Sequence, residues 1–332
     1  MTHDGGSAGN VPFISTGSLP TPEDVQRLLE EAHSRYASNT DGQNSQVYPA
    51  LSEADPDLFG MTIVGASGNI YEVGDSRHEF SIMSVSKPFV FALVAEIIGV
   101  EEARAKIGVN ATGYAFNSLT GIERNPKGLT NPMVNSGAIA TTSLVPGGTH
   151  EDKWKFLHDG LSRFAGRPLP MNDEVLESAS ATNFRNQSIA RMLQSLGAIY
   201  HDPAASVDLY TRQCSLNVSA KDLAVMAATL ADGGVNPITK ERVVDPGVCH
   251  YVLAVMATAG LYDTSGDWLY DIGLPGKSGI GGGILAVSPG KGGLGTFAPR
   301  LDKAGNSVKG QLAAKFLSQQ LGMDLFVSKP QI

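Results

Sequence analysis

Apolar residues recur at three- and four-residue spacing through the middle of the chain, a period that is typical of helices with one buried face. The clearest stretches lie between residues 86 and 242, at Trp154–Phe164, Ile189–Leu196 and Ala220–Leu230. Near the start, Thr21 precedes Pro22 and two acidic residues, which predicts a helix capped by Thr21 and running to about Tyr36. A last helix is predicted at about Lys309–Leu321.

Shorter apolar runs, separated by turn residues, occur towards both ends of the chain. Phe59–Val73 contains two such runs around Ala66–Asn69, which predicts a β-hairpin. Beyond Gly273 the chain is rich in glycine, with short runs at Ile284–Val287 and Gly295–Phe297. We therefore expect an α+β fold, with one antiparallel sheet assembled from both termini, flanked by helices and interrupted by a helical subdomain.

This pattern also sets the expected domain organisation. Residues 1–20 read as a mobile N-terminal tail, and residues 21–332 as a single domain. Within that domain, about 59–85 and 245–332 are expected to form the sheet part, and about 100–240 the helical subdomain.

Composition and charge exclude several classes of function. The 332 residues carry a formal charge of -8 without a basic stripe, so nucleic acid is not an expected partner. The longest apolar stretch, Pro88–Val100, contains Glu96 and is too short to cross a bilayer, so no membrane span is expected. The N-terminus lacks the pattern of a secretory signal, and the two cysteines, Cys214 and Cys249, show no C-x-x-C spacing, which favours the cytoplasm. The seven scattered histidines predict no metal site.

The first candidate for chemistry is Ser84-Val85-Ser86-Lys87, which leads directly into a helical apolar run. A separation of three residues places Ser84 and Lys87 on one face of a helix, and Pro88 indicates the first turn, where its missing N–H is tolerated. The same S-x-x-K pattern occurs at Ser288–Lys291, but there it contains Pro-Gly and predicts only a turn.

A serine at a helix start has a backbone N–H that is free to donate to a developing oxyanion. A lysine there acts as a base if burial lowers its pKa, and the apolar neighbours Phe89 and Val90 favour that. The motif thus predicts a serine nucleophile, Ser84, activated by Lys87. The alternative is a helix cap with a solvated lysine.

A second element, Lys277-Ser278-Gly279, follows the turn-like GLPG segment and precedes a predicted strand. It resembles the K-[TS]-G element beside the active site of serine β-lactamases and penicillin-binding proteins. Alone it is a common tripeptide and suits a surface turn, but it occurs here in the same order relative to an upstream S-x-x-K. The two motifs together favour a serine hydrolase.

Through much of its length the chain resembles the serine-dependent glutaminases, which share a β-lactamase-like fold. The segments that carry the resemblance are Ser84–Pro88, Phe116–Ser118, Asn131–Ile139, Arg185–Asn186, Leu209–Tyr210 with Cys214–Ser215, Gly260–Asp263, Gly273–Gly279 and Gly305–Gly310. The resemblance implies hydrolysis of L-glutamine to L-glutamate and ammonia through a glutamyl ester on Ser84, without a cofactor. It also implies a homodimer or homotetramer.

By the same resemblance, Lys87 takes the proton of the serine and Tyr262 relays a proton to the departing ammonia. The backbone N–H groups of Ser84 and Ile280 are implied to hold the oxyanion.

The amino-acid end of the substrate is implied to bind Asn135, Asn186 and Tyr210. Neutral amide and phenol donors suit a carboxylate at modest desolvation cost. Without the resemblance, the two asparagines would read as turn or cap residues, and Tyr210 and Tyr262 as core aromatics.

Three positions depart from the family pattern. The residue before the nucleophile, commonly glutamine, is Met83. The family segment Y-I-P-x-L reads Val47-Tyr48-Pro49-Ala50-Leu51, so the family tyrosine is either displaced by one place, to Tyr48, or absent. The family S-E ahead of R-N aligns with Ser178-Ala179, and the nearest glutamate, Glu177, stands two places early.

The displaced glutamate bears on the choice of substrate, because a carboxylate is the natural partner of the α-ammonium of an amino acid. A local shift that brings Glu177 and Tyr48 into the site would preserve recognition of glutamine. Otherwise the amine pocket is rebuilt, with weak glutaminase activity or a preference for a related amide. Two further alternatives are a penicillin-interactive hydrolase, which the S-x-x-K and K-S-G elements permit, and a non-catalytic amino-acid-binding homologue.

Overall fold

The computed structural model describes residues 17–327. Most of the predicted mobile tail, residues 1–16, lies outside the described residues, while Leu19 packs against buried residues of the core. The predicted first helix is confirmed as α1 (Pro22–Tyr36), where the side chain of Thr21 accepts a hydrogen bond from the backbone N–H of Asp24.

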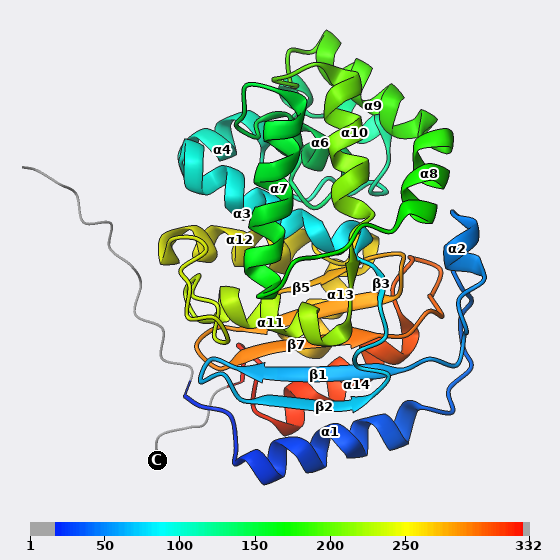
Figure 1. Cartoon of the computed structure of the whole chain (residues 1–332), viewed down its shortest axis with the longest axis vertical. Helices are drawn as coiled ribbons and strands as arrows, with labels where there is room; N and C mark the ends of the chain where they lie inside the picture. The colour runs from blue at the N-terminus through cyan, green and yellow to red at the C-terminus, as the bar shows by residue number, and fades with distance from the viewer. Residues whose placement is uncertain (1–16, 328–332) are drawn as a thin grey trace, which may run out of the picture.

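A five-stranded antiparallel sheet forms the centre of one half of the molecule (Figure 1). Its strands are β1 (Gly60–Gly65), β2 (Ile70–Gly74), β5 (Gly276–Ser278), β6 (Gly283–Ser288) and β7 (Gly292–Phe297), in the order β2-β1-β7-β6-β5. The predicted hairpin is confirmed as β1–β2, and β1 also pairs with β7, with Ile63 opposite Leu294. The sheet is therefore assembled from both ends of the chain, as predicted. A separate pair joins β3 (Phe80–Ser81) to β4 (Asn217–Val218).

Both faces of the sheet are covered. On β6, Leu285 and Val287 point into a cluster shared with α11 and α3, whereas Ile284 and Ala286 point to the opposite cluster with α1 and α14. Side chains of a strand alternate between its two faces, so each face is buried by its own helices. The helices beside the sheet are α11 (Ala220–Ala231), α12 (Pro246–Ala259), α13 (Ser265–Ile272) and α14 (Val308–Gln320).

The other half of the molecule is helical and lies above the sheet in Figure 1. Its helices are α3 (Lys87–Ile98), α4 (Val100–Ile107), α5 (Leu119–Glu123), α6 (Asn135–Ser143), α7 (His150–Ala165), α8 (Asp173–Thr182), α9 (Phe184–Ser195) and α10 (Pro203–Cys214). The remaining short pieces are α2 (Pro49–Ser52), η1 (Met83–Ser86), η2 (Pro126–Gly128) and η3 (Tyr262–Thr264). The α+β class predicted from the sequence is confirmed.

Helix α11 lies in the range that the sequence assigns to the helical subdomain, yet it packs on the sheet. Two glycines of β7 explain the close packing. A Cβ atom on Gly293 would lie 2.4 Å from the backbone nitrogen of Ala228, and one on Gly295 would lie 2.1 Å from the carbonyl oxygen of Ala220. The absence of side chains at these two positions lets the helix backbone lie directly against the strand.

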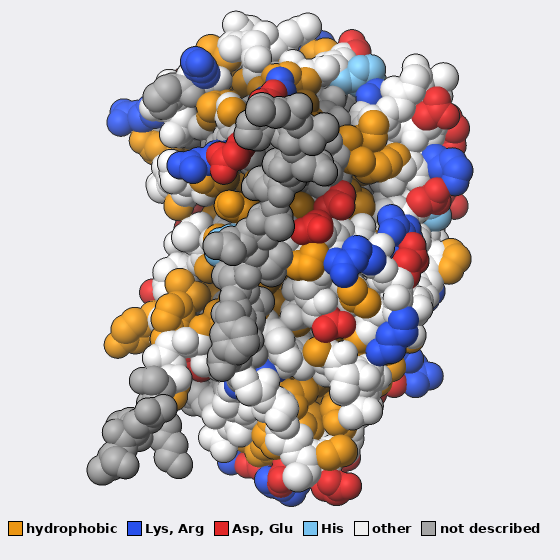
Figure 2. All heavy atoms as spheres, turned by 90° about the vertical axis from the view of Figure 1, so that its left-hand side faces the viewer, with side chains coloured by type: hydrophobic (Ala, Val, Ile, Leu, Met, Phe, Trp, Pro, Cys, Tyr) orange, Lys and Arg blue, Asp and Glu red, His pale blue; other side chains and the backbone are white. Residues whose placement is uncertain are grey.

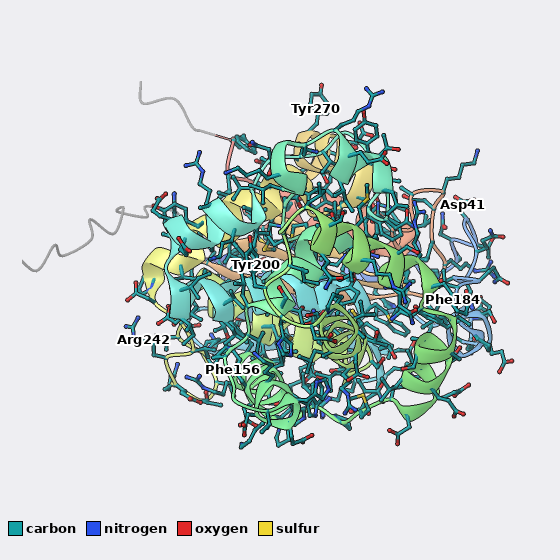
Figure 3. All side chains as sticks on the ribbon, turned by 90° about the horizontal axis from the view of Figure 1, so that it is seen from above. Asp41, Phe156, Phe184, Tyr200, Arg242 and Tyr270 are labelled. Carbon is teal, nitrogen blue, oxygen red and sulfur yellow. The ribbon has the colours of Figure 1, made fainter. Side chains whose placement is uncertain are left out.

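The surface and the hydropathy of the helices add little to these assignments. On the face shown in Figure 2, acidic and basic side chains are interspersed rather than gathered by sign. The most exposed aromatic side chains include Phe184 and Tyr270, which project from the periphery in Figure 3. Among residues 17–327 no single helix is long and apolar enough to span a bilayer. The continuous segment of η1 and α3, taken together with α4, has the length and apolar composition of a span, but the two parts are bent by 120° relative to each other.

Candidate active site

Ser84 lies in the short 3-10 helix η1, which runs directly into α3 at Lys87. The backbone N–H of Lys87 donates to the carbonyl of Ser84, and Pro88 follows in the first turn of α3, as the sequence indicated. Met83, immediately before the serine, has a φ of 49°, a left-handed conformation that costs a non-glycine residue energy. Such backbone strain concentrates at functional sites, and here it sets the angle at which Ser84 leaves the strand region.

The amine of Lys87 is fully enclosed and has only uncharged hydrogen-bond partners. Its Nζ donates to Asn135 Oδ1 at 2.8 Å and to the carbonyl of Met133 at 3.3 Å. Burial lowers the pKa of Lys87 to about 8. At pH 7 roughly one molecule in ten therefore carries the neutral amine that a general base requires.

A second buried lysine, Lys277, lies on the edge strand β5. Its Nζ donates to the carbonyls of Gly260 and Ser278, at 2.8 and 2.6 Å, and lies 4.4 Å from the centre of the Tyr262 ring. Burial, reinforced by the nearby charge of Lys87, holds the pKa of Lys277 well below its usual range. The K-S-G element therefore forms part of the site rather than a surface turn.

Two backbone N–H groups are free to hold an oxyanion. Among the described residues, neither Ser84 nor Ile280 has an acceptor for its N–H. The loop that follows β5 packs tightly on the serine turn, because a Cβ atom on Gly279 would lie 3.3 Å from the nitrogen of Ser84. Both donors therefore border the same small space beside the nucleophile.

Tyr262 lies in η3 with a φ of 54°, a second strained residue at the site. Its hydroxyl donates to the carbonyl of Ser278 at 3.4 Å, and its ring packs against Phe116 with 4.8 Å between ring centres. Burial raises the pKa of Tyr262 to about 12, against the opposite effect of its contacts with Ser84 and Ser278. The phenol therefore keeps its proton until a reacting group takes it.

A cavity of about 260 Å³ opens beside Ser84. It brings together six of the predicted residues, which are Ser84, Ile280, Asn135, Asn186, Tyr210 and Tyr48. Of these, Tyr210 donates to Asn135 Oδ1 at 3.1 Å, and Asn135 Nδ2 donates to Asn186 Oδ1 at 3.0 Å. Lys87 lies beneath this cavity, bonded to Asn135. Each of the three residues predicted to bind the amino-acid end is thus hydrogen-bonded to another of the three.

The charge of the cavity is unusual for an amino-acid site. Of the described residues that line it, Arg185 is the only charged one, and its Nε donates to the carbonyl of Asn117 at 2.8 Å. Ala179 lines the wall and is 4% exposed, but Glu177 is exposed on α8 and does not line the cavity. The segment is a helix, so a displacement of two residues turns a side chain by about 200°. The structure does not bring Glu177 into the site.

The other two departures from the family pattern both lie at the cavity. Tyr48 caps the start of α2 and is half-buried, with Val47 beside it on the same wall. Burial raises the pKa of Tyr48 to about 12. Met83 packs with Leu51 and Val175 in a small apolar cluster under the wall.

Three polar residues of the site were not assigned a role from the sequence. The K-S-G motif pointed to Lys277, but Asn183 and Thr211 carry no recognisable signal. Asn183 Nδ2 donates to Thr211 Oγ1 at 2.5 Å, and both residues are buried in the cavity wall.

Comparisons with known proteins agree with this geometry. The Glutaminase family model matches residues 42–326. "Glutaminase 2" from Yersinia pestis is 66% identical over 330 residues, covering 99% of this chain and 97% of that protein. A solved structure titled "Probable glutaminase ybaS" has a TM-score of 0.92 at 41% identity and covers 93% of this chain and 100% of that chain. A structure of Mglu "in its L-glutamate binding form" has a TM-score of 0.87 at 37% identity, covering 94% and 71%.

Proposed function

Since the chain belongs to the glutaminase family and hydrolyses L-glutamine to L-glutamate, we propose that it does so through a glutamyl ester on Ser84. The observation that carries the proposal is the enclosure of the Lys87 amine, three residues after Ser84, where it is hydrogen-bonded to Asn135 of the cavity wall. A lysine becomes a base when burial disfavours its charged form. No group of His, Cys, Asp or Glu within residues 17–327 could hold a metal ion, so every step is assigned to the side chains and backbone named here.

In the first step, Ser84 Oγ attacks the side-chain carbonyl carbon of glutamine while Lys87 Nζ takes the hydroxyl proton. The carbonyl oxygen becomes an oxyanion, which accepts hydrogen bonds from the N–H groups of Ser84 and Ile280. Each such donor is worth about 3 to 4 kcal/mol of barrier in comparable sites. The proton taken by Lys87 is stabilised by the acceptors Asn135 Oδ1 and Met133 O.

In the second step the carbon–nitrogen bond breaks. The phenol of Tyr262 donates its proton to the departing nitrogen, which leaves as ammonia, and Tyr262 is reprotonated from Lys87. The contact of Tyr262 with Ser84 supports this role. Water then attacks the ester carbon and gives a proton to Lys87 and Tyr262. These groups pass the proton to Ser84 Oγ as the ester bond breaks and glutamate leaves.

The amino-acid end of the substrate is proposed to contact Asn135, Asn186 and Tyr210, with Tyr48 lining the same cavity. The guanidinium of Arg185, at the rim, supports attraction of the substrate carboxylate. The α-ammonium meets only amide and hydroxyl oxygens, because none of the described lining residues is acidic.

The covalent intermediate can be tested directly. Protein mixed with L-glutamine, quenched in acid within milliseconds and digested, is expected to show the mass of one added glutamyl group on the peptide that contains Ser84. Tyr262→Phe slows the transfer of a proton to the leaving group, and its spectrum is the control for an unmodified peptide. Rapid turnover with no modified peptide under any quench condition would exclude the ester mechanism.

Assembly and location complete the proposal. We propose a homodimer or homotetramer, supported by the family resemblance and by the exposed aromatic side chains of Phe184 and Tyr270. Light scattering coupled to gel filtration tests it, and a monomer at all concentrations would contradict it. A cytoplasmic location is supported by Cys214 and Cys249, which are both buried and unpaired. Fractionation of the source cells tests that assignment.

A further inference from the structure

A continuous chain of hydrogen bonds begins at Lys87 and crosses three amide side chains. Lys87 Nζ donates to Asn135 Oδ1 at 2.8 Å, and Asn135 Nδ2 donates to Asn186 Oδ1 at 3.0 Å. Asn186 Nδ2 then donates to Asn183 Oδ1 at 2.6 Å. Every link has the same sense, with the donor on the side of Lys87 and the acceptor beyond it.

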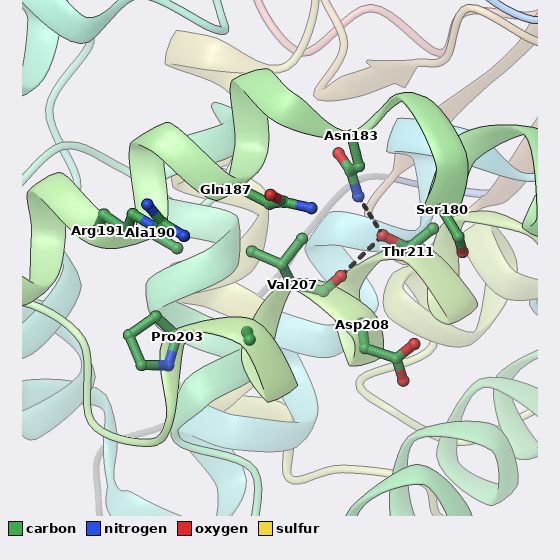
Figure 4. A pocket seen from close by; sticks show the side chains of 10 residues that line it. Ser180, Asn183, Gln187, Ala190, Arg191, Pro203, Val207, Asp208 and Thr211 are labelled. Atoms are coloured by element: carbon green, nitrogen blue, oxygen red, sulfur yellow. Dashed lines mark hydrogen bonds between the residues drawn. The ribbon is translucent and has the colours of Figure 1, made fainter.

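The chain ends on α10. Asn183 Nδ2 donates to Thr211 Oγ1 at 2.5 Å, and that hydroxyl donates to the backbone carbonyl of Val207 at 2.7 Å (Figure 4). A threonine hydroxyl has one proton, and here the helix backbone takes it. Thr211 therefore presents only its lone pair to Asn183, which fixes which end of the Asn183 amide faces it.

The Thr211 hydroxyl, the last acceptor in this chain of hydrogen bonds, determines the orientation of every amide before it. Rotating the Asn183 amide by half a turn would set its oxygen against the Thr211 oxygen and its nitrogen against Asn186 Nδ2. Both contacts would be lost, and the same holds for Asn186 and Asn135 in turn. With the observed orientation, the carbonyl oxygen of each amide points towards Lys87. Aligned dipoles of this kind reinforce one another.

We propose that Asn183 and Thr211 are positioning residues, which orient Asn186 and Asn135 so that amide oxygens face the ammonium formed on Lys87 during the reaction. The proposal rests on the assignment of Lys87 as the base. The negative ends of three amide dipoles then favour the charged form of the lysine just when it has taken the serine proton.

Among the described residues, no charged side chain of opposite sign contacts the Lys87 amine to stabilise its ammonium. The titratable groups that face it are Lys277 from β5, Tyr262 from η3, and Tyr210 and Cys214 from α10, and α6 adds only Asn135. Burial raises the pKa of Cys214 and holds the pKa of Tyr210 well above 10, so these groups are neutral at physiological pH. The carbonyl of Met133 is the one remaining acceptor on the amine.

The position of the pair also separates it from a merely structural contact. Asn183 and Thr211 line both the catalytic cavity and a second cavity of about 230 Å³ between α9 and α10, whose wall includes Gln187 and Asp208 (Figure 4). They form the partition between the two spaces. Loss of the Thr211 hydroxyl removes the acceptor of Asn183 Nδ2 and so releases the end of the amide chain.

The test compares Thr211→Val with Thr211→Ser and Thr141→Val. Valine has the shape of threonine without the hydroxyl, whereas serine retains it. Thr141 is a matched control, because it is a buried helical threonine whose hydroxyl donates only to the carbonyl four residues before, that of Gly137. Ammonia release from L-glutamine is measured for each variant as a function of pH, with thermal unfolding as a check on folding.

Thr211→Val is expected to lower kcat by about tenfold, because the released amide chain weakens the hydrogen bond between Asn135 and the charged Lys87 amine, with KM changed less than threefold. Removing dipoles that favour the ammonium lowers the pKa of Lys87, so the acid limb of kcat/KM moves to lower pH by about half a unit. In Thr211→Ser and Thr141→Val the acid limb of kcat/KM is expected at the same pH as in the wild type.

A Thr211→Val enzyme that behaves like Thr141→Val overturns the proposal, as does a loss of activity carried by KM with the acid limb unmoved. Failure of the base assignment gives a different result. In that case the Lys87→Met enzyme keeps the acid limb of the wild-type pH profile of kcat/KM, whatever the results for the Thr211 variants.

Discussion

In the proposed mechanism, Lys87 is the residue on which the chemistry depends. Its amine has neutral partners only, and burial lowers its pKa to about 8, so both charge states are accessible in one catalytic cycle. Met83, next to the serine, and Tyr262 both have left-handed backbone conformations, a strain that concentrates at functional sites. Residue by residue, the site is set up for proton transfer without a metal or a histidine.

The pH dependence of activity follows from the lowered pKa of Lys87. A base must be neutral to accept a proton, so kcat/KM for L-glutamine is expected to rise with pH and level off above about pH 8. Lys87→Arg, which stays protonated, is expected to lose about 10²- to 10⁴-fold at every pH. Steady-state ammonia release measures both, and a wild-type rate that falls between pH 6 and 8 would be incompatible with a lysine base.

Substrate recognition is open to a test at Ala179. A carboxylate introduced there would face the cavity and pair with the α-ammonium, so Ala179→Glu is expected to lower KM for L-glutamine by roughly tenfold with little change in kcat. Ala181→Glu, on the exposed face of the same helix, is the matched control. An unchanged or higher KM in a folded Ala179→Glu protein would show that the amine is already well bound by neutral oxygens.

Glu177 provides the complementary test. It is exposed and lies outside the cavity, so Glu177→Gln is expected to leave both kcat and KM within twofold of the wild type. A large increase in KM for L-glutamine would mean that α8 shifts when substrate binds.

Much of the site could be predicted at this scale, and the reason for each miss is physical. Ser84, Lys87 and Lys277 stand out because their motifs combine spacing with helix or strand context. Glu177 was expected near the site because a side chain two places away along a strand points to the same face, and a loop can adjust. Along a helix the same displacement turns the side chain to another face. Asn183 and Thr211 stay hidden, because no sequence period shows which polar side chains will meet across two helices.

At the scale of elements, the contact between β7 and α11 joins the sheet to the helical half. The strand presents Gly293 and Gly295 to the alanine-rich face of α11, and the backbones approach too closely for any side chain between them. Helical and strand periods predict both elements, but not this docking, since the glycines acquire meaning only once the register of the sheet is known. β3 and β4, each two residues long, are too short to show any period.

The contact predicts a large effect from one methyl group. Gly295→Ala is expected to destabilise the protein by about 1–3 kcal/mol, because its Cβ would overlap the carbonyl of Ala220 and force the helix away. Gly266→Ala, in α13, meets nothing within 4 Å and should be neutral or stabilising by about 0.5–1 kcal/mol. Urea titration of both variants provides the comparison. Equal stabilities would show that α11 can move without cost.

The whole molecule places its site where its two halves meet. The sheet, closed by strands from both ends of the chain, supplies Lys277 and the loop with Ile280, while the helical half supplies Asn135, Asn186 and Tyr210. Neither half contains a complete site. The arrangement could be predicted in outline from strands at both ends and helices between them.

The complete site is built from lysine, serine, tyrosine and amide groups, which predicts indifference to chelators. Activity after dialysis against EDTA is expected to stay within about 10% of the untreated enzyme, because no metal-ligand cluster exists in residues 17–327. Loss of activity that Zn²⁺ or Mg²⁺ restores would contradict the proposed steps.

The central claim is that Ser84 is the nucleophile that hydrolyses L-glutamine. It is tested most directly by ammonia release from L-glutamine with the wild type and with Ser84→Ala at about pH 8.5, above the pKa of Lys87. Thermal unfolding verifies that both proteins are folded. We expect robust turnover by the wild type and none above background in the variant. Turnover that survives in folded Ser84→Ala would contradict it.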